Sequence, residues 1–247
     1  MADEPKRVLH VAWSFPPAQG SGGADALDLA NASARRGHDV TVLTAGTDAF
    51  DLVVGADADR VGQIDPKVAV VRVDNPLGVR DPIVNRWPDW RRRYGWDHAE
   101  WREAISRAIF PEPTGDSWRP AWLAPATAAA RALAEAKPFD LAIATVLPAV
   151  GAGVALSLNA ATGLPFVVYE CEPWSFEPPA GESQAPRGLT IFEQCFARAI
   201  QVWCPDAARA AARRREFPSW GDKIRAVGFD REAPDAAFGP LEEQLGW

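Results

Sequence analysis

Residues 8–44 constrain the fold of this chain more than any other stretch. An apolar run begins at Val8 and ends at residues 15–17, Phe-Pro-Pro, and three of the four residues 20–23 are glycine. Ala and Leu then recur at helical spacing until Gly37, and a second apolar run follows at once. This order of strand, glycine-rich turn, helix and strand predicts a βαβ unit, and the backbone N–H groups at the start of its helix suit an anion such as pyrophosphate.

Apolar strands and helical segments alternate along most of the remaining chain. The predicted strands are residues 67–74, 139–145, 165–170, 201–204 and 223–227, and the predicted helices are 97–110, 121–136, a segment ending near 163, 188–200 and 206–215. Such an alternation indicates an α/β, Rossmann-like fold, in which a mostly parallel sheet carries helices on both faces. In sheets of this kind ligands gather at the carboxyl ends of the strands.

Composition limits the classes of protein to which the chain can belong. With 247 residues, of which 47% are hydrophobic, it is long enough for one large α/β domain, which is the simpler interpretation, or for two small ones. The formal net charge of -7 argues against a nucleic-acid partner, because phosphate recognition depends on clustered Lys and Arg.

Cysteine and histidine usage favours a cytoplasmic protein without a metal site. The three cysteines, Cys171, Cys195 and Cys204, are widely spaced and form no C-x-x-C pair, so we expect neither disulfides nor structural zinc. The three histidines are too scattered for a zinc site, and no metal or other cofactor is expected. The charged N-terminus, and the lack of any apolar run of about 18 residues, predict neither a signal peptide nor a membrane span.

Residues 75–122 interrupt the alternation with a Trp- and Arg-rich insert. It contains several tryptophans and prolines and the run Arg91-Arg92-Arg93. Three interpretations stay open: an acceptor wall on which a sugar stacks, an interfacial patch that touches anionic lipid at a membrane surface, or a local mini-core with a solvated basic face. His98, near the start of the helix in this insert, is either an acceptor-pocket residue or a surface residue.

Four segments together resemble one enzyme family. They are the βαβ stretch of residues 8–44, Phe110-Pro111-Glu112 with the downstream Trp118 and Trp122, residues 139–148, and residues 163–170. In their residues and their order they are similar to the N-terminal domain of family-four glycosyltransferases of the GT-B class. The resemblance covers most of residues 7–230, and its most specific part is the βαβ unit.

The resemblance implies half of an enzyme that transfers a sugar from a nucleotide-sugar donor to an acceptor hydroxyl. In that family an N-terminal Rossmann-like domain mainly holds the acceptor, a small molecule or glycan, and its glycine-rich loop, here Gly22 and Gly23, approaches the donor phosphates. The C-terminal domain grips the donor through a basic pair and two glutamates separated by seven residues, and this chain has no such motif near a glycine-rich loop. Residues 1–230 are therefore predicted to be the acceptor-side domain, and residues 231–247 a tail or linker toward a missing C-terminal domain.

The resemblance also implies which side chains do the chemistry. Many relatives carry a His after the fourth strand, where this chain has residues 145–148, Thr-Val-Leu-Pro, so no catalytic His is assigned. One branch of the family has Arg-Asp-x-Trp after the fifth strand, and here Glu172 and Trp174 stand at the Asp and Trp positions. Glu172 is therefore expected to accept the proton of the acceptor hydroxyl. Trp174 and His98 are the expected acceptor-binding residues.

Two other functions stay open. One is a binding or regulatory module that kept the fold and lost the chemistry. The other is an NAD-dependent oxidoreductase, which is disfavoured because Asp25 occupies the third glycine position of the dinucleotide fingerprint.

Two basic features of the sequence have structural interpretations. His10 lies inside the first strand and is expected to be a satisfied core residue rather than a ligand. Residues 213–215, three consecutive arginines, are expected to form a solvated helix end that complements the helix dipole.

Overall fold

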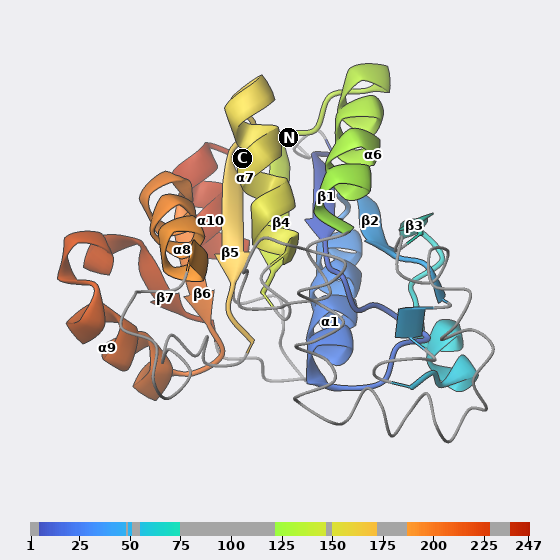
Figure 1. The fold of residues 1–247 in the computed structure, drawn as a ribbon, viewed down its shortest axis with the longest axis horizontal. Coiled ribbons are helices and arrows are strands. Elements are labelled where there is room, and N and C mark those ends of the chain that lie inside the picture. The colour runs from blue at the N-terminus through green and yellow to red at the C-terminus, as the bar shows by residue number, and fades with distance from the viewer. Residues whose placement is uncertain are drawn as a thin grey trace.

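A computed structural model describes residues 5–47, 49–50, 55–74, 122–146, 150–171, 187–227 and 238–247. In this part of the chain seven strands form one sheet, in the order β3-β2-β1-β4-β5-β6-β7, and every neighbouring pair is parallel (Figure 1). The strands are β1 (Arg7–Val11), β2 (Asp39–Ala45), β3 (Ala69–Val73), β4 (Leu141–Thr145), β5 (Phe166–Tyr169), β6 (Gln201–Cys204) and β7 (Ile224–Ala226). The predicted α/β, Rossmann-like fold with a parallel sheet is confirmed.

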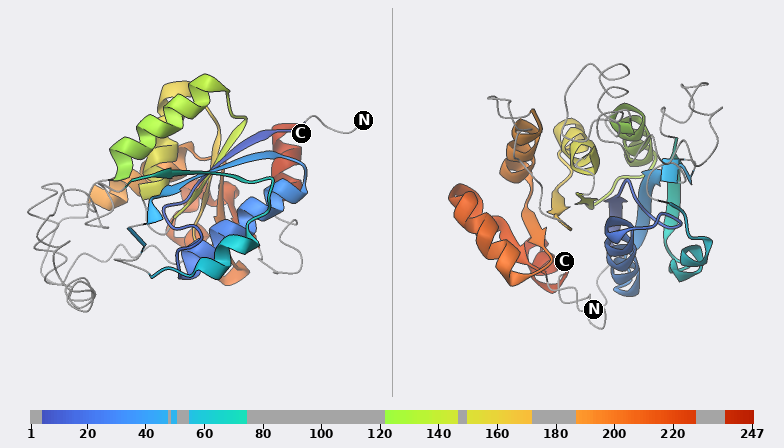
Figure 2. Two further views of the ribbon diagram at one scale, coloured as in Figure 1. Left: turned by 90° about the vertical axis from the view of Figure 1, so that its right-hand side faces the viewer. Right: turned by 60° about the horizontal axis from the view of Figure 1, so that its bottom comes forward.

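Helices cover both faces of this sheet, as predicted. One face carries α6 (Leu123–Ala136), α7 (Val150–Thr162), α8 (Arg187–Arg198) and α9 (Ala207–Glu216). The other face carries α1 (Ser21–Arg35), the short 3-10 helix η1 (Ala58–Gln63) and α10 (Phe238–Leu245). A second 3-10 helix, η4 (Pro218–Lys223), leads into β7. Figure 2 shows α6 and α7 on the opposite side of the sheet from α1 and η1.

Burial on both faces explains why the central strands are apolar throughout. Every residue of β4 is buried, and its side chains alternate between two cores. Leu141 and Ile143 pack in the cluster on the α1 side, whereas Ala142 and Ala144 pack in the cluster on the α7 side. Since burying a Leu or Ile side chain stabilises the fold by about 1.5–3 kcal/mol, these two cores supply much of the driving force for the sheet.

The segment 231–247, expected to be a tail or linker, contains helix α10. Phe238 is 1% exposed and lies in the same core as Trp203, with the two rings edge to face and their centroids 5.4 Å apart. Glu242 of the same helix accepts a hydrogen bond from Arg36 Nε at 2.5 Å, just after the end of α1. The helix is therefore part of the packed core of this domain, and a connection from here to a second domain stays a prediction.

The Trp- and Arg-rich insert lies outside the described residues except for its last member. Trp122 is fully buried, and its Nε1 donates a hydrogen bond to the Val73 carbonyl oxygen at 3.0 Å. The end of the insert is thus fixed beside β3, while the three interpretations of the insert itself stay open.

The described residues also bear on the cysteine and membrane expectations. Cys171, Cys195 and Cys204 are buried free thiols. Burial raises the pKa of both Cys195 and Cys204 to about 12, so neither is a thiolate near neutral pH. Within the described ranges no helix has both the length and the apolar character needed to cross a membrane.

Candidate functional site

The sheet reverses its strand order between β1 and β4. From β1 the chain proceeds to β2 and β3 on one side, and from β4 it proceeds to β5, β6 and β7 on the other. In open α/β sheets ligands bind at such a topological switch point, just beyond the carboxyl ends of the central strands. Because α1 follows β1 and α7 follows β4, two helices begin at this edge. We take the carboxyl ends of β1, β4 and β5 as the candidate site and call them the switch edge.

The loop after β1 turns into α1 at Gly20. Gly20 has a φ of 102°, a conformation that glycine adopts at little cost, and as the N-cap it offers no side chain to the amides of the first turn. The helix begins at Ser21, so Gly22 and Gly23 lie in its first turn and not, as expected, in the turn before it. A Cβ on Gly23 would lie 3.2 Å from the Ala18 carbonyl oxygen, so glycine lets the helix approach the loop closely.

The N-terminus of α7 packs directly on the ends of β1 and β4. A Cβ on Gly151 would lie 2.9 Å from the Thr145 carbonyl oxygen and 3.1 Å from that of Val11. Thr145 itself is 2% exposed, and its Oγ1 has no hydrogen-bond partner among the residues that the structure describes. Thr145 Oγ1 is thus a buried polar atom at the switch edge, and an unsatisfied group of this kind costs about 1–3 kcal/mol.

Tyr169 of β5 and Asp25 of α1 connect the sheet to the helix. Tyr169 Oη donates a hydrogen bond to Asp25 Oδ2 at 3.1 Å. Burial, together with the nearby Asp25 carboxylate, raises the pKa of Tyr169 well above its usual range, so the hydroxyl stays protonated and remains a donor. Tyr169 pairs in register with Thr145 of the neighbouring strand, which places both residues at the same edge of the sheet.

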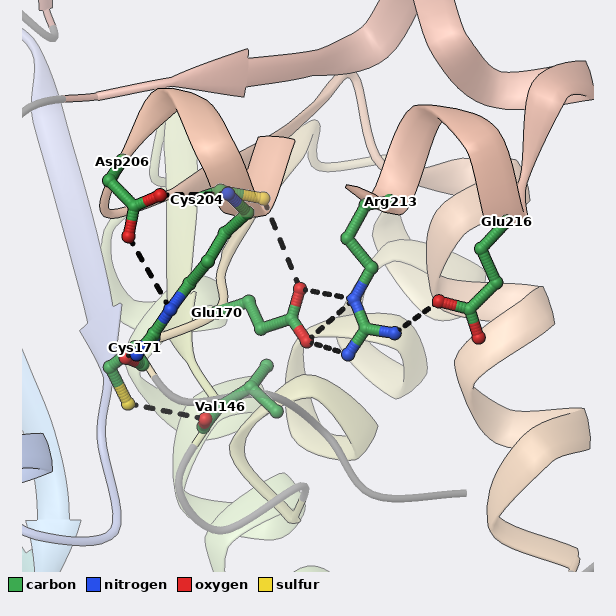
Figure 3. A network of polar contacts seen from close by, with 8 residues as sticks. Val146, Glu170, Cys171, Cys204, Asp206, Arg213 and Glu216 are labelled. Carbon is green, nitrogen blue, oxygen red and sulfur yellow. Dashed lines mark hydrogen bonds and ion pairs between the residues drawn. The ribbon is translucent and has the colours of Figure 1, made fainter. Parts of the chain in front are cut away.

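Glu170, the first residue after β5, forms a buried ion pair with Arg213 of α9 (Figure 3). Arg213 Nε lies 3.0 Å from each carboxylate oxygen of Glu170, and Nη2 of the same guanidinium also contacts the carboxylate. Glu170 is 3% exposed and Arg213 is 9% exposed. Cys204 Sγ lies 4.0 Å from Glu170, and Arg213 Nη1 reaches Glu216 at 2.5 Å. The prediction of a solvated helix end is therefore wrong for Arg213, because its guanidinium is buried in an ion pair with Glu170.

The next residue along the chain is also held by α9. Arg209 Nη1 donates a hydrogen bond to the Cys171 carbonyl oxygen at 2.6 Å, and the Cys171 thiol donates to the Val146 carbonyl oxygen at 3.3 Å. Arg209 and Arg213 lie four residues apart, so they share one face of the helix. One face of α9 therefore fixes two consecutive residues at the point where the chain leaves β5.

The predicted site residues fall in two groups. Gly22 and Gly23 are described and lie in the first turn of α1, at the switch edge. Glu172, Trp174 and His98 lie outside the described residues, so their roles stay predictions.

Sequence reasoning missed three side chains that shape this edge. A carboxylate directly after an apolar strand, as at Glu170, signals a buried charge in need of a partner, but no sequence pattern identifies Arg213 as that partner. Asp25 stands out in the sequence only as the residue that breaks a glycine pattern. Its hydrogen bond to Tyr169 becomes visible only once α1 lies across the sheet.

Comparison with known proteins finds similarity at the level of the fold. No protein family and no curated protein matches the sequence. Among solved structures, Arabidopsis thaliana UGT89C1 in complex with quercetin is 13% identical, with a TM-score of 0.51 over 90% of this chain and 49% of that chain. The chain shares its Rossmann-like α/β fold with part of UGT89C1. It spans about half the length of UGT89C1, and at 13% identity the likeness concerns the fold alone.

Two further structures align more loosely. UGT89C1 in complex with UDP-L-rhamnose is 13% identical over 92% of this chain and 49% of that chain, with a TM-score of 0.47. The crystal structure of O-ureido-L-serine synthase is also 13% identical, over 89% of this chain and 63% of that chain, with a TM-score of 0.23.

Proposed function

We propose that this chain is the acceptor-side half of a GT-B glycosyltransferase related to family four. The reaction is transfer of a sugar from a nucleotide-sugar donor to an acceptor hydroxyl. The proposal is supported by the Rossmann-like fold, which is shared with about half of UGT89C1, and it rests for the family on the interpretation of residues 7–230 given under Sequence analysis. UGT89C1 forms a complex with quercetin, and a small molecule or a glycan is the acceptor that we propose for this chain.

The observation that carries the proposal is the start of α1 at the switch edge. The N-cap is Gly20, so no side chain caps the helix, and the first turn contains no acidic residue. The helix dipole adds about half a positive charge at this end. The diphosphate of a donor placed at Gly22 and Gly23 would accept hydrogen bonds from these amides.

For proton transfer we propose Glu172 as the general base. Glu170 stands two residues earlier, but it is 3% exposed and paired with Arg213, so it is unavailable to a substrate hydroxyl. Glu172 would accept the hydroxyl proton as the acceptor oxygen bonds to the anomeric carbon and the nucleoside diphosphate leaves. Trp174 and His98 are the proposed acceptor contacts, with the Trp174 ring providing a stacking surface.

A nucleotide cofactor of the dinucleotide type fits this edge less well. In a dinucleotide-binding fold the third glycine allows the helix to pack closely on the strand. Here Asp25 occupies that position, and its side chain extends to Tyr169 at 3.1 Å. The contact gives a physical reason to prefer sugar transfer over hydride transfer.

The proposal is tested with the purified 247-residue chain. We expect nearly no sugar transfer from nucleotide-sugar donors, because the motifs that grip the donor lie in a second domain. Appreciable turnover by this chain alone would show that it is a complete enzyme and contradict the half-enzyme assignment. Calorimetric titration with NAD is the companion measurement, since tight NAD binding would favour the oxidoreductase instead.

A further inference from the structure

Three consecutive carbonyl oxygens of the loop after β1 are held by groups from a later part of the chain. The Pro16 carbonyl accepts a hydrogen bond from Arg72 Nη2, and the Pro17 carbonyl accepts one from the Asp57 amide at 2.7 Å. The Ala18 carbonyl accepts one from Arg60 Nη1 at 3.2 Å. The carbonyl side of this loop, residues 15–20, is therefore anchored to β3 and to the segment around η1.

Arg72 is a half-buried member of this set of anchors. It lies on β3 in register with Thr44 of β2, and its Nη1 also donates to the Ala45 carbonyl oxygen at 3.4 Å. It makes no ion pair with the residues that the structure describes, and its guanidinium lies 5.9 Å from the centroid of the Phe50 ring. Burial lowers the pKa of Arg72. Because burial costs the Arg72 guanidinium part of its hydration, we expect its hydrogen bonds to add little to the free energy of unfolding. Their main effect is to fix the position of the loop carbonyl that they hold.

The same loop leads directly into the first turn of α1. Gln19, its penultimate residue, is tied to the opposite segment by its amide, which donates to the Gly55 carbonyl at 3.0 Å. Gly20 then turns the chain, and its carbonyl accepts from Ala24 at 3.3 Å to begin the helix. The carbonyls of residues 16–18 thus accept from Arg72, Asp57 and Arg60, and the first carbonyl to accept from an amide of α1 is that of Gly20.

We propose that Arg72, together with Arg60, is a positioning residue that fixes the glycine-rich loop and so aligns the first-turn amides of α1 for a diphosphate group. Neither arginine needs to touch the ligand in this role. The ligand class rests on the proposed function, whereas the anchoring of the loop rests only on the contacts described above. Both guanidinium groups also add positive charge beside the loop, which strengthens the preference of this helix end for an anion.

The experiment uses the 247-residue chain labelled with ¹⁵N and compares Arg72→Met, Arg72→Lys and Arg60→Met. The matched control is Lys67→Met, which removes an exposed charge just before the same strand. Two quantities are measured by NMR: hydrogen exchange of the Ala18, Gln19 and Asp57 amides, and shifts of the residue 21–23 amides on addition of inorganic pyrophosphate.

We expect exchange of the Ala18, Gln19 and Asp57 amides to become about tenfold faster or more in Arg72→Met, while amides between β4 and β5 keep their rates. Pyrophosphate affinity falls several-fold in the same variant. Arg72→Lys recovers part of both effects, since an ammonium still donates to one carbonyl, and Lys67→Met matches the wild type. If Arg72→Met does not fold, amide exchange and pyrophosphate affinity are compared between the wild type and the variants Arg60→Met and Arg72→Lys.

The outcomes separate this inference from the proposed function. Unchanged exchange of the loop amides in Arg72→Met and Arg60→Met would overturn the anchoring role. A loosened loop with unchanged pyrophosphate affinity would overturn the alignment role. Absence of pyrophosphate binding in the wild type would remove the phosphate site of the proposed function, and the exchange data would still decide whether Arg72 holds the loop.

Discussion

Arg213 of α9 and Glu170 at the end of β5 form an ion pair inside the protein although they lie 43 residues apart in sequence. The guanidinium approaches both carboxylate oxygens, and the neighbouring Arg209 binds the carbonyl of Cys171. Residues 170 and 171, which precede Glu172, are thereby attached to α9. This ion pair and other contacts of the buried elements lead to four predictions.

Removing one partner of the buried pair should be strongly destabilising. Arg213→Met leaves the Glu170 carboxylate buried without its cation, and we expect the free energy of unfolding to fall by about 3–5 kcal/mol. The double variant Glu170→Met/Arg213→Met should recover most of this loss, because no unpaired charge remains. Urea denaturation gives the free energy of unfolding of the wild type, the single variant and the double variant. The control is Arg215→Met, on the exposed side of the same helix, with an expected change within about 0.5 kcal/mol. Equal effects at positions 213 and 215 would contradict the buried pair.

The hydrogen bond from the Tyr169 hydroxyl to Asp25 should contribute modestly to the free energy of unfolding. Tyr169→Phe removes one hydrogen bond, and since Asp25 is only partly buried its carboxylate regains water. We expect a loss of about 0.5–1.5 kcal/mol in the free energy of unfolding. A double-mutant cycle with Asp25→Ala isolates the pair. Strictly additive single effects would mean that the two side chains do not interact in solution.

Two glycine substitutions should change stability in opposite directions. A Cβ at Gly151 meets backbone oxygens of Thr145 and Val11 at 2.9 and 3.1 Å, so Gly151→Ala must push α7 away from the sheet. We expect a loss of about 1–3 kcal/mol, measured as a lower Tm. Among the described residues, leaving aside its chain neighbours and the backbone of its own helix, Gly239 in α10 has no atom within 4 Å of such a Cβ. Gly239→Ala should therefore stabilise slightly, by less than about 1 kcal/mol. A tolerated Gly151→Ala would show that α7 does not sit this close to the strand ends.

Buried His10 should make the fold sensitive to mild acid. His10 is 1% exposed, its Nε2 lies 3.0 Å from Ser33 Oγ, and burial together with His38 lowers its pKa to about 3. Between about pH 6.5 and pH 3 the unfolded chain binds a proton at this residue and the folded one does not, so stability decreases as the pH falls through this window. The loss amounts to about 2 kcal/mol at pH 5.

The variant His10→Leu tests this origin of the acid sensitivity. Its free energy of unfolding should depend less steeply on pH between 6.5 and 5 than that of the wild type. Asp39 and Glu242, whose pKa values are lowered mainly by hydrogen bonds from Lys137 and Arg36, cause a further loss at lower pH in both proteins. An unchanged slope between pH 6.5 and 5 would exclude His10 as the titrating group.

Most elements of this fold are predictable from local pattern. The strand predicted at 201–204 is β6 as observed, and the helix predicted at 206–215 is α9 over residues 207–216. Such elements are short apolar runs or helical repeats bounded by turn residues. The spacing of their apolar residues shows which face of each helix or strand is buried, and burial of that face stabilises the element. The first residue of α1 is harder to predict, because Gly22 and Gly23 have low helix propensity. In the folded chain the absence of a Cβ at Gly23 lets the helix start close to Ala18.

The candidate site was predictable only in part. The glycine-rich turn at the switch edge follows from the βαβ pattern, and so does the expectation of an anion at the start of α1. Three arginines at a helix end complement the dipole, and this purely local argument predicts a solvated Arg213. Its burial depends on Glu170, on a different element, and no local pattern contains that information.

By itself, therefore, the sequence determined the kind and order of the strands and helices, because hydrophobic periodicity and turn residues act over a few neighbouring positions. Only the tertiary structure decided which charges are buried and which loop carbonyls are held, as at Glu170 with Arg213 and at Pro16 with Arg72. These contacts join residues far apart in the chain. They form because a desolvated charge must find a partner in whatever element the packing brings beside it.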